Sequence, residues 1–307
     1  MREHDFQSGK IVIRRKLLEA EDFTRYLIEY PSDGLTITGI MQIPARGEPP
    51  YPVIVLNHGF FSRTVYNSGD GTDRAADFLN RYGYLTFSSD YRSWGGSETG
   101  ESLFYSGLVI DVINLMRAIP SIPQADPGRV GMWGHSMGGG VTLKVLTVLG
   151  GENQAGVKVG AAVIYSSVSA DFADIIGRWG PGCLGDVIQG EAIVGCNSSD
   201  ILPADLPADL TASYFNAVTD SEMLKAVSPL YHLDSVSAPV QINYGIEDGR
   251  SSAGTPPEWS LKMYEGFVAA GKDAQIVSQA GEGHSFIGQP WFDFMLRALK
   301  YFDKHVK

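Results

Sequence analysis

The fold is decided by the stretch Arg129-Val130-Gly131-Met132-Trp133-Gly134-His135-Ser136-Met137-Gly138. Its first half, residues 129–133, is typical of a short buried strand, and residues 139–149 are typical of a helix. A serine with a glycine two positions away on each side, set between a strand and a helix, is the sequence form of a nucleophile elbow. Such a turn is strained, and glycine neighbours let the flanking elements pass close together. We therefore predict that Ser136 is a nucleophile.

Strands and helices alternate on both sides of this turn. Three strand-like runs separated by polar turns come first, which predicts an antiparallel start to the sheet. After them the alternation predicts a mostly parallel sheet with helices on both faces. The predicted strands are 11–17, 24–30, 35–43, 53–56, 84–88, 130–133, 161–165, 240–244 and 275–278, and the predicted helices are 75–82, 103–119, 139–149, 259–270 and 291–305.

The alternation lapses between Ser166 and Pro239, where Gly, Asp and Pro are frequent and aromatic residues are scattered. This segment is too long for a plain loop in a compact domain. We expect an α/β core formed by residues 1–166 and 239–307, and a cap insertion of short helices over residues 167–238 that covers the carboxyl ends of the strands. A peripheral excursion without a role at the site is the alternative.

Composition limits the class of protein. The chain has 307 residues, of which 44% are hydrophobic and 19% charged, as expected for a soluble globular protein. Its net charge of −11 disfavours nucleic acid and anionic lipid as partners. The amino terminus has no apolar core of signal-peptide length, and no stretch of sequence is expected to be long and apolar enough to span a bilayer. A cytoplasmic location is therefore expected. The sequence does not indicate an oligomeric state.

The two cysteines, Cys183 and Cys196, both lie in the cap segment. They would form a local disulfide in an exported protein, but two free thiols are the favoured expectation for a reducing cytosol. Their spacing does not match a metal site, and neither a metal nor an organic cofactor is expected.

A serine nucleophile needs a base within hydrogen-bond reach. Of the six histidines, His284 is the candidate base, because it lies in a glycine-flanked loop, Gly281-Glu282-Gly283-His284, between the last predicted strand and the last helix. The other five histidines are excluded by their positions: His4 and His305 lie at the termini, His58 and His135 in turn motifs, and His232 in the cap segment.

The base in turn needs an acid, which chain order places between the serine and the histidine, at the end of a strand. Glu247 and Asp248 follow the predicted strand 240–244, and we choose Asp248. Glu247 is the competitor, because some enzymes of this kind use Glu as the acid.

Acyl transfer also needs donors for a developing oxyanion, and two backbone amides usually provide them. We assign one to Met137, directly after the nucleophile. The other is assigned to Phe60, in the turn Asn57-His58-Gly59-Phe60-Phe61 that follows strand 53–56. His58 is expected to brace this turn.

Together these segments resemble serine hydrolases of the α/β-hydrolase fold, in the dienelactone-hydrolase-like and prolyl-oligopeptidase-like branch. The resemblance implies Ser136, Asp248 and His284 as a triad, and it implies that Asp90, Arg92 and Gly96 tie loops beside the site. The matching segments are Asn57-His58-Gly59, Asp90-Tyr91-Arg92 with Gly95-Gly96-Ser97, Gly134 to Gly139, Tyr244 to Asp248, and Gly281 to His284. The chain departs from the family after the acid, where members commonly place a Val and a Pro. Here residues 249–257 form a longer and more polar segment.

The first hypothesis is hydrolysis of a small carboxylic ester through an acyl-enzyme. Aromatic side chains are expected to line the substrate pocket, namely those of Phe61, Tyr66, Trp94, Tyr105 and Trp179. The second hypothesis is a small exopeptidase or amidase with the same triad, whose substrate amine would be held by carboxylates of the cap such as Asp171, Asp174, Asp186 and Glu191. A non-catalytic receptor that keeps the fold is a third.

Overall fold

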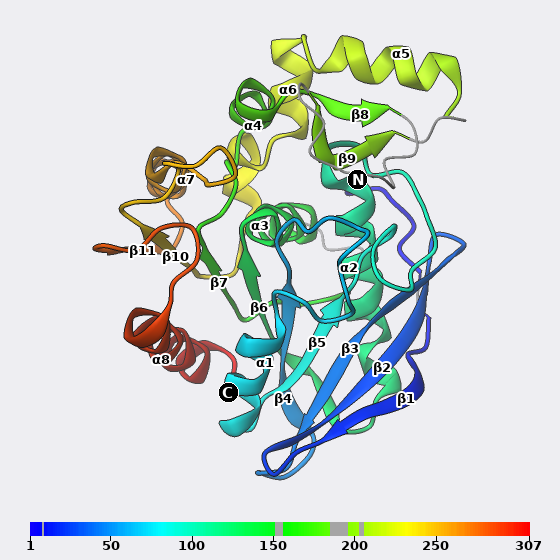
Figure 1. The fold of residues 1–307 in the computed structure, drawn as a ribbon, viewed down its shortest axis with the longest axis vertical. Coiled ribbons are helices and arrows are strands. Elements are labelled where there is room, and N and C mark those ends of the chain that lie inside the picture. Colours follow the sequence, from blue (N-terminus) through cyan, green and yellow to red (C-terminus); the bar gives the residue numbers. More distant parts are fainter. Residues whose placement is uncertain (8, 151–155, 185–195, 203–205) are drawn as a thin grey trace.

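A computed structural model describes residues 1–307 apart from 8, 151–155, 185–195 and 203–205. Within the described residues, nine strands form one sheet in the order β1-β2-β3-β5-β4-β6-β7-β10-β11 (Figure 1). The strands are β1 (Val12–Glu19), β2 (Phe23–Ser32), β3 (Leu35–Pro44), β4 (Tyr51–Asn57), β5 (Leu85–Ser89), β6 (Ala125–His135), β7 (Ala161–Tyr165), β10 (Val240–Gly245) and β11 (Ala274–Gln279).

The pairing of the strands changes once along the sheet, from antiparallel to parallel. Strands β1, β2, β3 and β5 pair antiparallel in that order, while β5, β4, β6, β7, β10 and β11 are parallel. This confirms the predicted fold class: an antiparallel start followed by a parallel sheet whose carboxyl ends meet at one edge.

Helices cover both faces of the sheet, and β4 shows why. Val53 and Val55 point to one face and pack in the same core cluster as Leu108 and Val141, whereas Ile54 and Leu56 point to the other face. The first face carries α2 (Ser106–Ala118), α3 (Met137–Leu149) and α7 (Pro257–Ala269), and the second carries α1 (Asp73–Arg81) and α8 (Gly288–His305).

The expectation that no run could span a membrane needs a correction. It concerns helix α2 and the short 3-10 helices beside it, η1 (Leu103–Tyr105) and η2 (Ile119–Ser121). Residues 103–121 are long and apolar enough to cross a membrane by length and composition, although no such run was expected from the sequence. In the structure this segment packs against β2, β5 and α3. Its apolar side chains therefore belong to the core of the domain.

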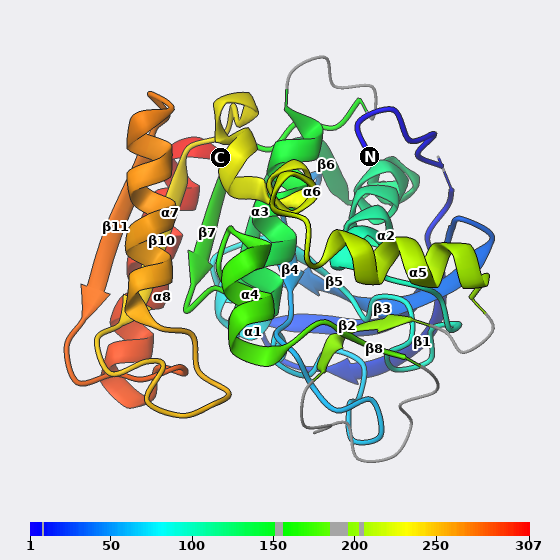
Figure 2. The ribbon, with the colours of Figure 1, turned by 90° about the horizontal axis from the view of Figure 1, so that it is seen from above.

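The insertion between β7 and β10 forms its own group of elements at one end of the molecule (Figure 1 and Figure 2). It contains α4 (Phe172–Trp179), β8 (Gly182–Leu184), β9 (Asn197–Leu202), α5 (Ala208–Ala217), α6 (Ser221–Val227) and the 3-10 helix η3 (Pro229–Ser235). Short helices were expected here, but the parallel pair β8-β9 was not. The expectation of free thiols is wrong, because Cys183 and Cys196 form a disulfide.

Candidate active site

Ser136 occupies a sharp turn between β6 and α3. Its backbone has a φ of 55° and a ψ of −122°, a conformation that a residue with a side chain rarely adopts. The two glycines of the motif are required by close approach: a Cβ at Gly134 would collide with the carbonyl oxygen of Gly138, and a Cβ at Gly138 with that of Asn57. The predicted strand–turn–helix context of Ser136 is thus what the structure has.

The three side chains predicted to act together meet at the carboxyl edge of the sheet. Oγ of Ser136 lies 2.9 Å from Nε2 of His284. Nδ1 of the same imidazole lies 3.0 Å from Oδ2 and 3.2 Å from Oδ1 of Asp248. Each distance is within hydrogen-bond range, so the geometry permits proton transfer from serine to histidine with the imidazole oriented by a carboxylate.

Asp248 is held on the side away from the histidine as well. The amides of Gly249 and Thr255 donate to Oδ1 at 2.7 and 2.9 Å, and Oγ1 of Thr255 donates to Oδ2 at 2.7 Å. Burial raises the pKa of this carboxyl, but the contacts with His284, Thr255 and Gly249 outweigh burial and leave the pKa below its usual value. Asp248 is therefore ionised at neutral pH.

The competing acid, Glu247, points elsewhere. Its carboxylate forms an ion pair with Arg250, and its side chain is 31% exposed against 1% for Asp248. The choice of Asp248 over Glu247 therefore agrees with the geometry.

The turn after β4 lies against the nucleophile. A Cβ on Gly59 would come within 3.1 Å of the Cβ of Ser136, closer than most Cβ contacts, so a side chain there would press against the nucleophile. In the described part of the chain, the amides of Phe60 and Met137 donate to no other group. Both are available to a ligand oxygen beside Ser136, which is the requirement for the two predicted oxyanion donors.

His58 braces the same turn, as expected. Its Nδ1 lies 2.6 Å from the carbonyl oxygen of Gly59, and its Nε2 lies 3.2 Å from that of Asp90. Its ring stacks on Tyr66 with centroids 4.6 Å apart. Desolvation lowers the pKa of this buried imidazole, so a role in moving protons at the site is not indicated.

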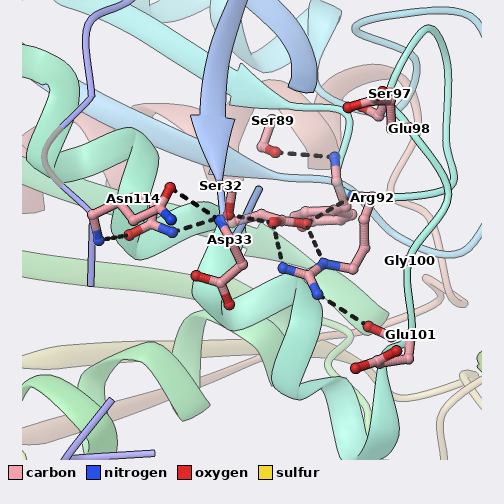
Figure 3. A network of polar contacts seen from close by, with 12 residues as sticks. Ser32, Asp33, Ser89, Arg92, Ser97, Glu98, Gly100, Glu101 and Asn114 are labelled. Atoms are coloured by element: carbon pink, nitrogen blue, oxygen red, sulfur yellow. Dashed lines mark hydrogen bonds and ion pairs between the residues drawn. The ribbon is translucent and has the colours of Figure 1, made fainter. Parts of the chain in front are cut away.

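Buried polar groups tie the neighbouring loop, as the resemblance implied for Asp90, Arg92 and Gly96. The Asp90 carboxylate accepts hydrogen bonds from Thr38, Tyr66 and Ser68, and the amide of Gly96 donates to Oγ1 of Thr38. The guanidinium of Arg92 binds both carboxylate oxygens of Asp111 at 3.0 and 2.9 Å and donates to the carbonyl oxygen of Glu101 (Figure 3). These contacts fix residues 90–101 beside the oxyanion turn.

The predicted aromatic pocket is the part that the structure corrects. Tyr66, Trp94 and Tyr105 are 6%, 1% and 1% exposed, so they belong to the core and do not line an open cleft. Phe61 packs on His58 and Tyr66. Trp179 packs on Trp259 and donates to the carbonyl oxygen of Ser252. Phe60, in the turn after β4, is 37% exposed.

Two residues with contacts to the triad were not singled out from the sequence. Nε2 of His135 lies 3.0 Å from the carbonyl oxygen of His284, and Thr255 binds Asp248. His135 had a signal, since it is the variable residue before the nucleophile. For Thr255 the only signal in the sequence was the unusual polarity of its loop. Among the described residues, no cluster of His, Cys, Asp or Glu is arranged to hold a metal ion.

Comparisons with known proteins agree with this architecture. The family model "Serine aminopeptidase, S33" matches residues 48–182, which is less than half of the chain. The acylaminoacyl peptidase of Pyrococcus horikoshii is 20% identical, with a TM-score of 0.67 over 94% of this chain and 43% of that one. The chain thus spans less than half the length of this peptidase.

Two similar structures are closer to this chain in size. Acetyl xylan esterase 1 of a Thermoanaerobacterium species is 16% identical, with a TM-score of 0.61 over 98% of this chain and 90% of that one. Est1E of Butyrivibrio proteoclasticus is 16% identical, with a TM-score of 0.60 over 91% and 97%. At such identities the likeness shows the fold, and these structures have the same layered sheet as this one. The chain therefore has the α/β-hydrolase fold, with a serine, a histidine and an aspartate hydrogen-bonded at the carboxyl edge of its sheet.

Proposed function

We propose that this protein is a serine hydrolase that cleaves a small carboxylic ester through an acyl-enzyme. The observation that carries the proposal is the chain of hydrogen bonds from Ser136 through His284 to Asp248 at a strained turn. A hydroxyl in such a chain becomes a nucleophile because the imidazole accepts its proton as the new bond forms.

The residues account for each step of that reaction. Oγ of Ser136 attacks the ester carbonyl carbon while its proton passes to Nε2 of His284, and the amides of Phe60 and Met137 bind the resulting oxyanion. Collapse of this intermediate breaks the carbon–oxygen bond, and Nε2–H returns the proton to the leaving alcohol. A water molecule, activated by the same imidazole, then hydrolyses the acyl-enzyme and releases the acid. Throughout, the Asp248 carboxylate stabilises the imidazolium.

Cleavage of peptides or other amides by the same triad is the second candidate. The matching family model and several similar structures belong to peptidases, which favours it. An aminopeptidase needs carboxylates to hold the substrate amine. Two of the four predicted candidates already share one cation, because Lys262 pairs with Asp171 at 2.8 Å and with Asp174 at 2.9 Å. The other two, Asp186 and Glu191, lie outside the described residues.

This ion pairing supports the ester hypothesis. Lys262 is tied to both carboxylates, and Tyr231 donates a further hydrogen bond to Asp171. A substrate ammonium would have to compete with this lysine for the same two carboxylates. An ester substrate makes no such demand, because neither its acyl group nor its alcohol needs a buried countercharge.

Parallel assays separate the two candidates. We expect the protein to hydrolyse short-chain p-nitrophenyl esters at rates at least about a hundredfold above aminoacyl p-nitroanilides, with both activities lost in Ser136→Ala. A preference for the anilides would assign the site to peptide or amide cleavage. Ester hydrolysis that survives in Ser136→Ala would show that it arises elsewhere.

A further inference from the structure

Thr255 lies where the acid, the base and the strand beside the nucleophile meet. The residue is 2% exposed. Its amide donates to Oδ1 of Asp248 at 2.9 Å and its Oγ1 lies 2.7 Å from Oδ2. The same Oγ1 lies 3.3 Å from Nδ1 of His284 and 3.0 Å from the carbonyl oxygen of Ser166. One side chain therefore touches two members of the triad.

The hydroxyl of Thr255 has one proton and two possible acceptors, Oδ2 of Asp248 and the carbonyl oxygen of Ser166. A carboxylate is the stronger acceptor, and the contact with Oδ2 is the shorter of the two, so the proton points to Asp248. If it pointed to Ser166 instead, lone pairs of Oγ1 and of an ionised carboxylate would face each other at 2.7 Å. The hydroxyl is thus a donor to the same oxygen that receives Nδ1–H of His284.

With this donor in place, the carboxylate has no free position. An ionised carboxylate has about four lone-pair sites. The amides of Gly249 and Thr255 use those of Oδ1, while Oγ1 of Thr255 and Nδ1 of His284 use those of Oδ2. Rotation of the Asp248 side chain would break several of these bonds at once. Thr255 supplies two of the four.

The loop that carries Thr255 is itself fastened by the cap. Arg178, near the end of α4, donates to the carbonyl oxygens of Gly249 and Ser251 at 3.1 and 2.7 Å, and Trp179 donates to that of Ser252 at 2.8 Å. Gly254 packs so closely that a Cβ there would come within 2.6 Å of Oδ1 of Asp248. The longer, polar segment after the acid therefore folds back onto the carboxylate it follows.

We propose that Thr255 is a positioning residue of the triad, whose hydroxyl locks the Asp248 carboxylate in the orientation that receives Nδ1–H of His284. This inference rests on the proposed serine-hydrolase function. It assigns a task to the segment in which the chain departs from its family, and it makes that task dependent on the hydroxyl rather than on the methyl group.

The test compares Thr255→Val, which removes the donor at nearly constant shape, with Thr255→Ser, which keeps it. Thr72→Val is the matched control, because Thr72 is equally buried and bonds Gly69 and Ser88 without touching the triad. For Thr255→Val we expect kcat on a p-nitrophenyl ester to fall about ten- to a hundredfold with KM changed less than about twofold. Thr255→Ser should restore most of kcat, and Thr72→Val should keep it.

Two further readouts separate positioning from a loss of structure. Without the donor, the pKa of Asp248 rises and its charge holds the His284 proton more tightly, so the acid limb of kcat/KM moves to higher pH in Thr255→Val. The downfield proton NMR signal of Nδ1–H of His284 should shift in Thr255→Val and return in Thr255→Ser. The proposal would be overturned if Thr255→Val had the kcat and the acid limb of the wild type. It would also be overturned if kcat of Thr255→Ser were no higher than that of Thr255→Val. Because the NMR signal does not depend on turnover, a wild-type protein without hydrolase activity would refute the function and still report on Thr255.

Discussion

Nε2 of His135 lies 3.0 Å from the carbonyl oxygen of His284, so the residue before the nucleophile also holds the backbone of the base. The ring of His135 stacks on Tyr165, with centroids 4.2 Å apart. Desolvation, with a smaller contribution from His284, lowers the pKa of His135 to about 3. The imidazole is therefore neutral in the working range of pH, and Nε2–H donates to the carbonyl.

Replacing His135 with Phe should keep the stacking and remove the donor. A neutral hydrogen bond contributes about 1 kcal/mol, so we expect kcat on an ester to fall roughly three- to tenfold. The shape of the pH profile should stay the same because His135 does not titrate there. His232→Phe is the control, since this histidine also contacts a backbone carbonyl, that of Ala226, but lies in η3. Equal activities of the two variants would contradict this role.

Asp248→Asn should reduce kcat by about four orders of magnitude, because an amide cannot stabilise the imidazolium and favours the wrong tautomer. Glu247→Gln should change kcat by less than about threefold, since Glu247 pairs with the exposed Arg250. Steady-state kinetics of the two variants on one ester measures both effects. If the order of the two effects were reversed, the acid would be Glu247.

The lowered pKa of Asp248 predicts how stability responds to acid. A carboxyl whose native pKa lies below its unfolded value of about 4 stabilises the fold above that pH, and the contribution is lost as the pH falls through the native pKa. The difference in thermal midpoint between the wild type and Asp248→Asn should therefore shrink as the pH is lowered from about 6 to about 3. A difference that stays constant over this range would argue against an ionised, stabilising carboxylate.

Asp200 of the cap holds the start of α2 in an unusual conformation. Phe104 and Tyr105 have φ values of 52° and 61°, and their amides donate to the Asp200 carboxylate at 2.8 and 3.1 Å. Nζ of Lys144 donates to the carbonyl oxygen of Phe104. Burial raises the pKa of Asp200 to about 7 and lowers that of Lys144 to about 7, while the charge of each group partly opposes the shift of the other.

Asp200→Ala should lower the free energy of unfolding by about 2–3 kcal/mol, because it leaves the two buried amides of Phe104 and Tyr105 without an acceptor. Asp200→Asn keeps an acceptor oxygen and should cost less. Urea unfolding measures both, with Asp209→Ala on the exposed side of α5 as the control. A loss no larger than that of the control would show that the cap is not anchored through Asp200.

The parallel core and the triad could be predicted because each depends on short-range patterns. Strands such as Ala161–Tyr165 are continuous apolar runs, and the order of Ser136, Asp248 and His284 is a property of the chain itself. The pocket could not be predicted in this way, because aromatic composition does not distinguish core from cleft. Trp94, for example, is 1% exposed.

Contacts that depend on loop geometry could not be predicted from the sequence either. Nothing in Asn197–Leu202 alternates as a half-buried strand does, yet it pairs with β8. Thr255 reaches Asp248 only because α4 holds the intervening loop. The cytoplasmic location stays a prediction, and the disulfide between Cys183 and Cys196 weighs against it because disulfides persist mainly in oxidising compartments.

The central claim is that Ser136 is activated by His284 and Asp248. Labelling with a fluorophosphonate, followed by intact-protein and peptide mass spectrometry, tests it without knowledge of the substrate. We predict one adduct per chain on Ser136, no adduct in Ser136→Ala, and much slower labelling in His284→Ala. A folded wild-type protein that does not react, or an adduct that persists in Ser136→Ala, would contradict the claim.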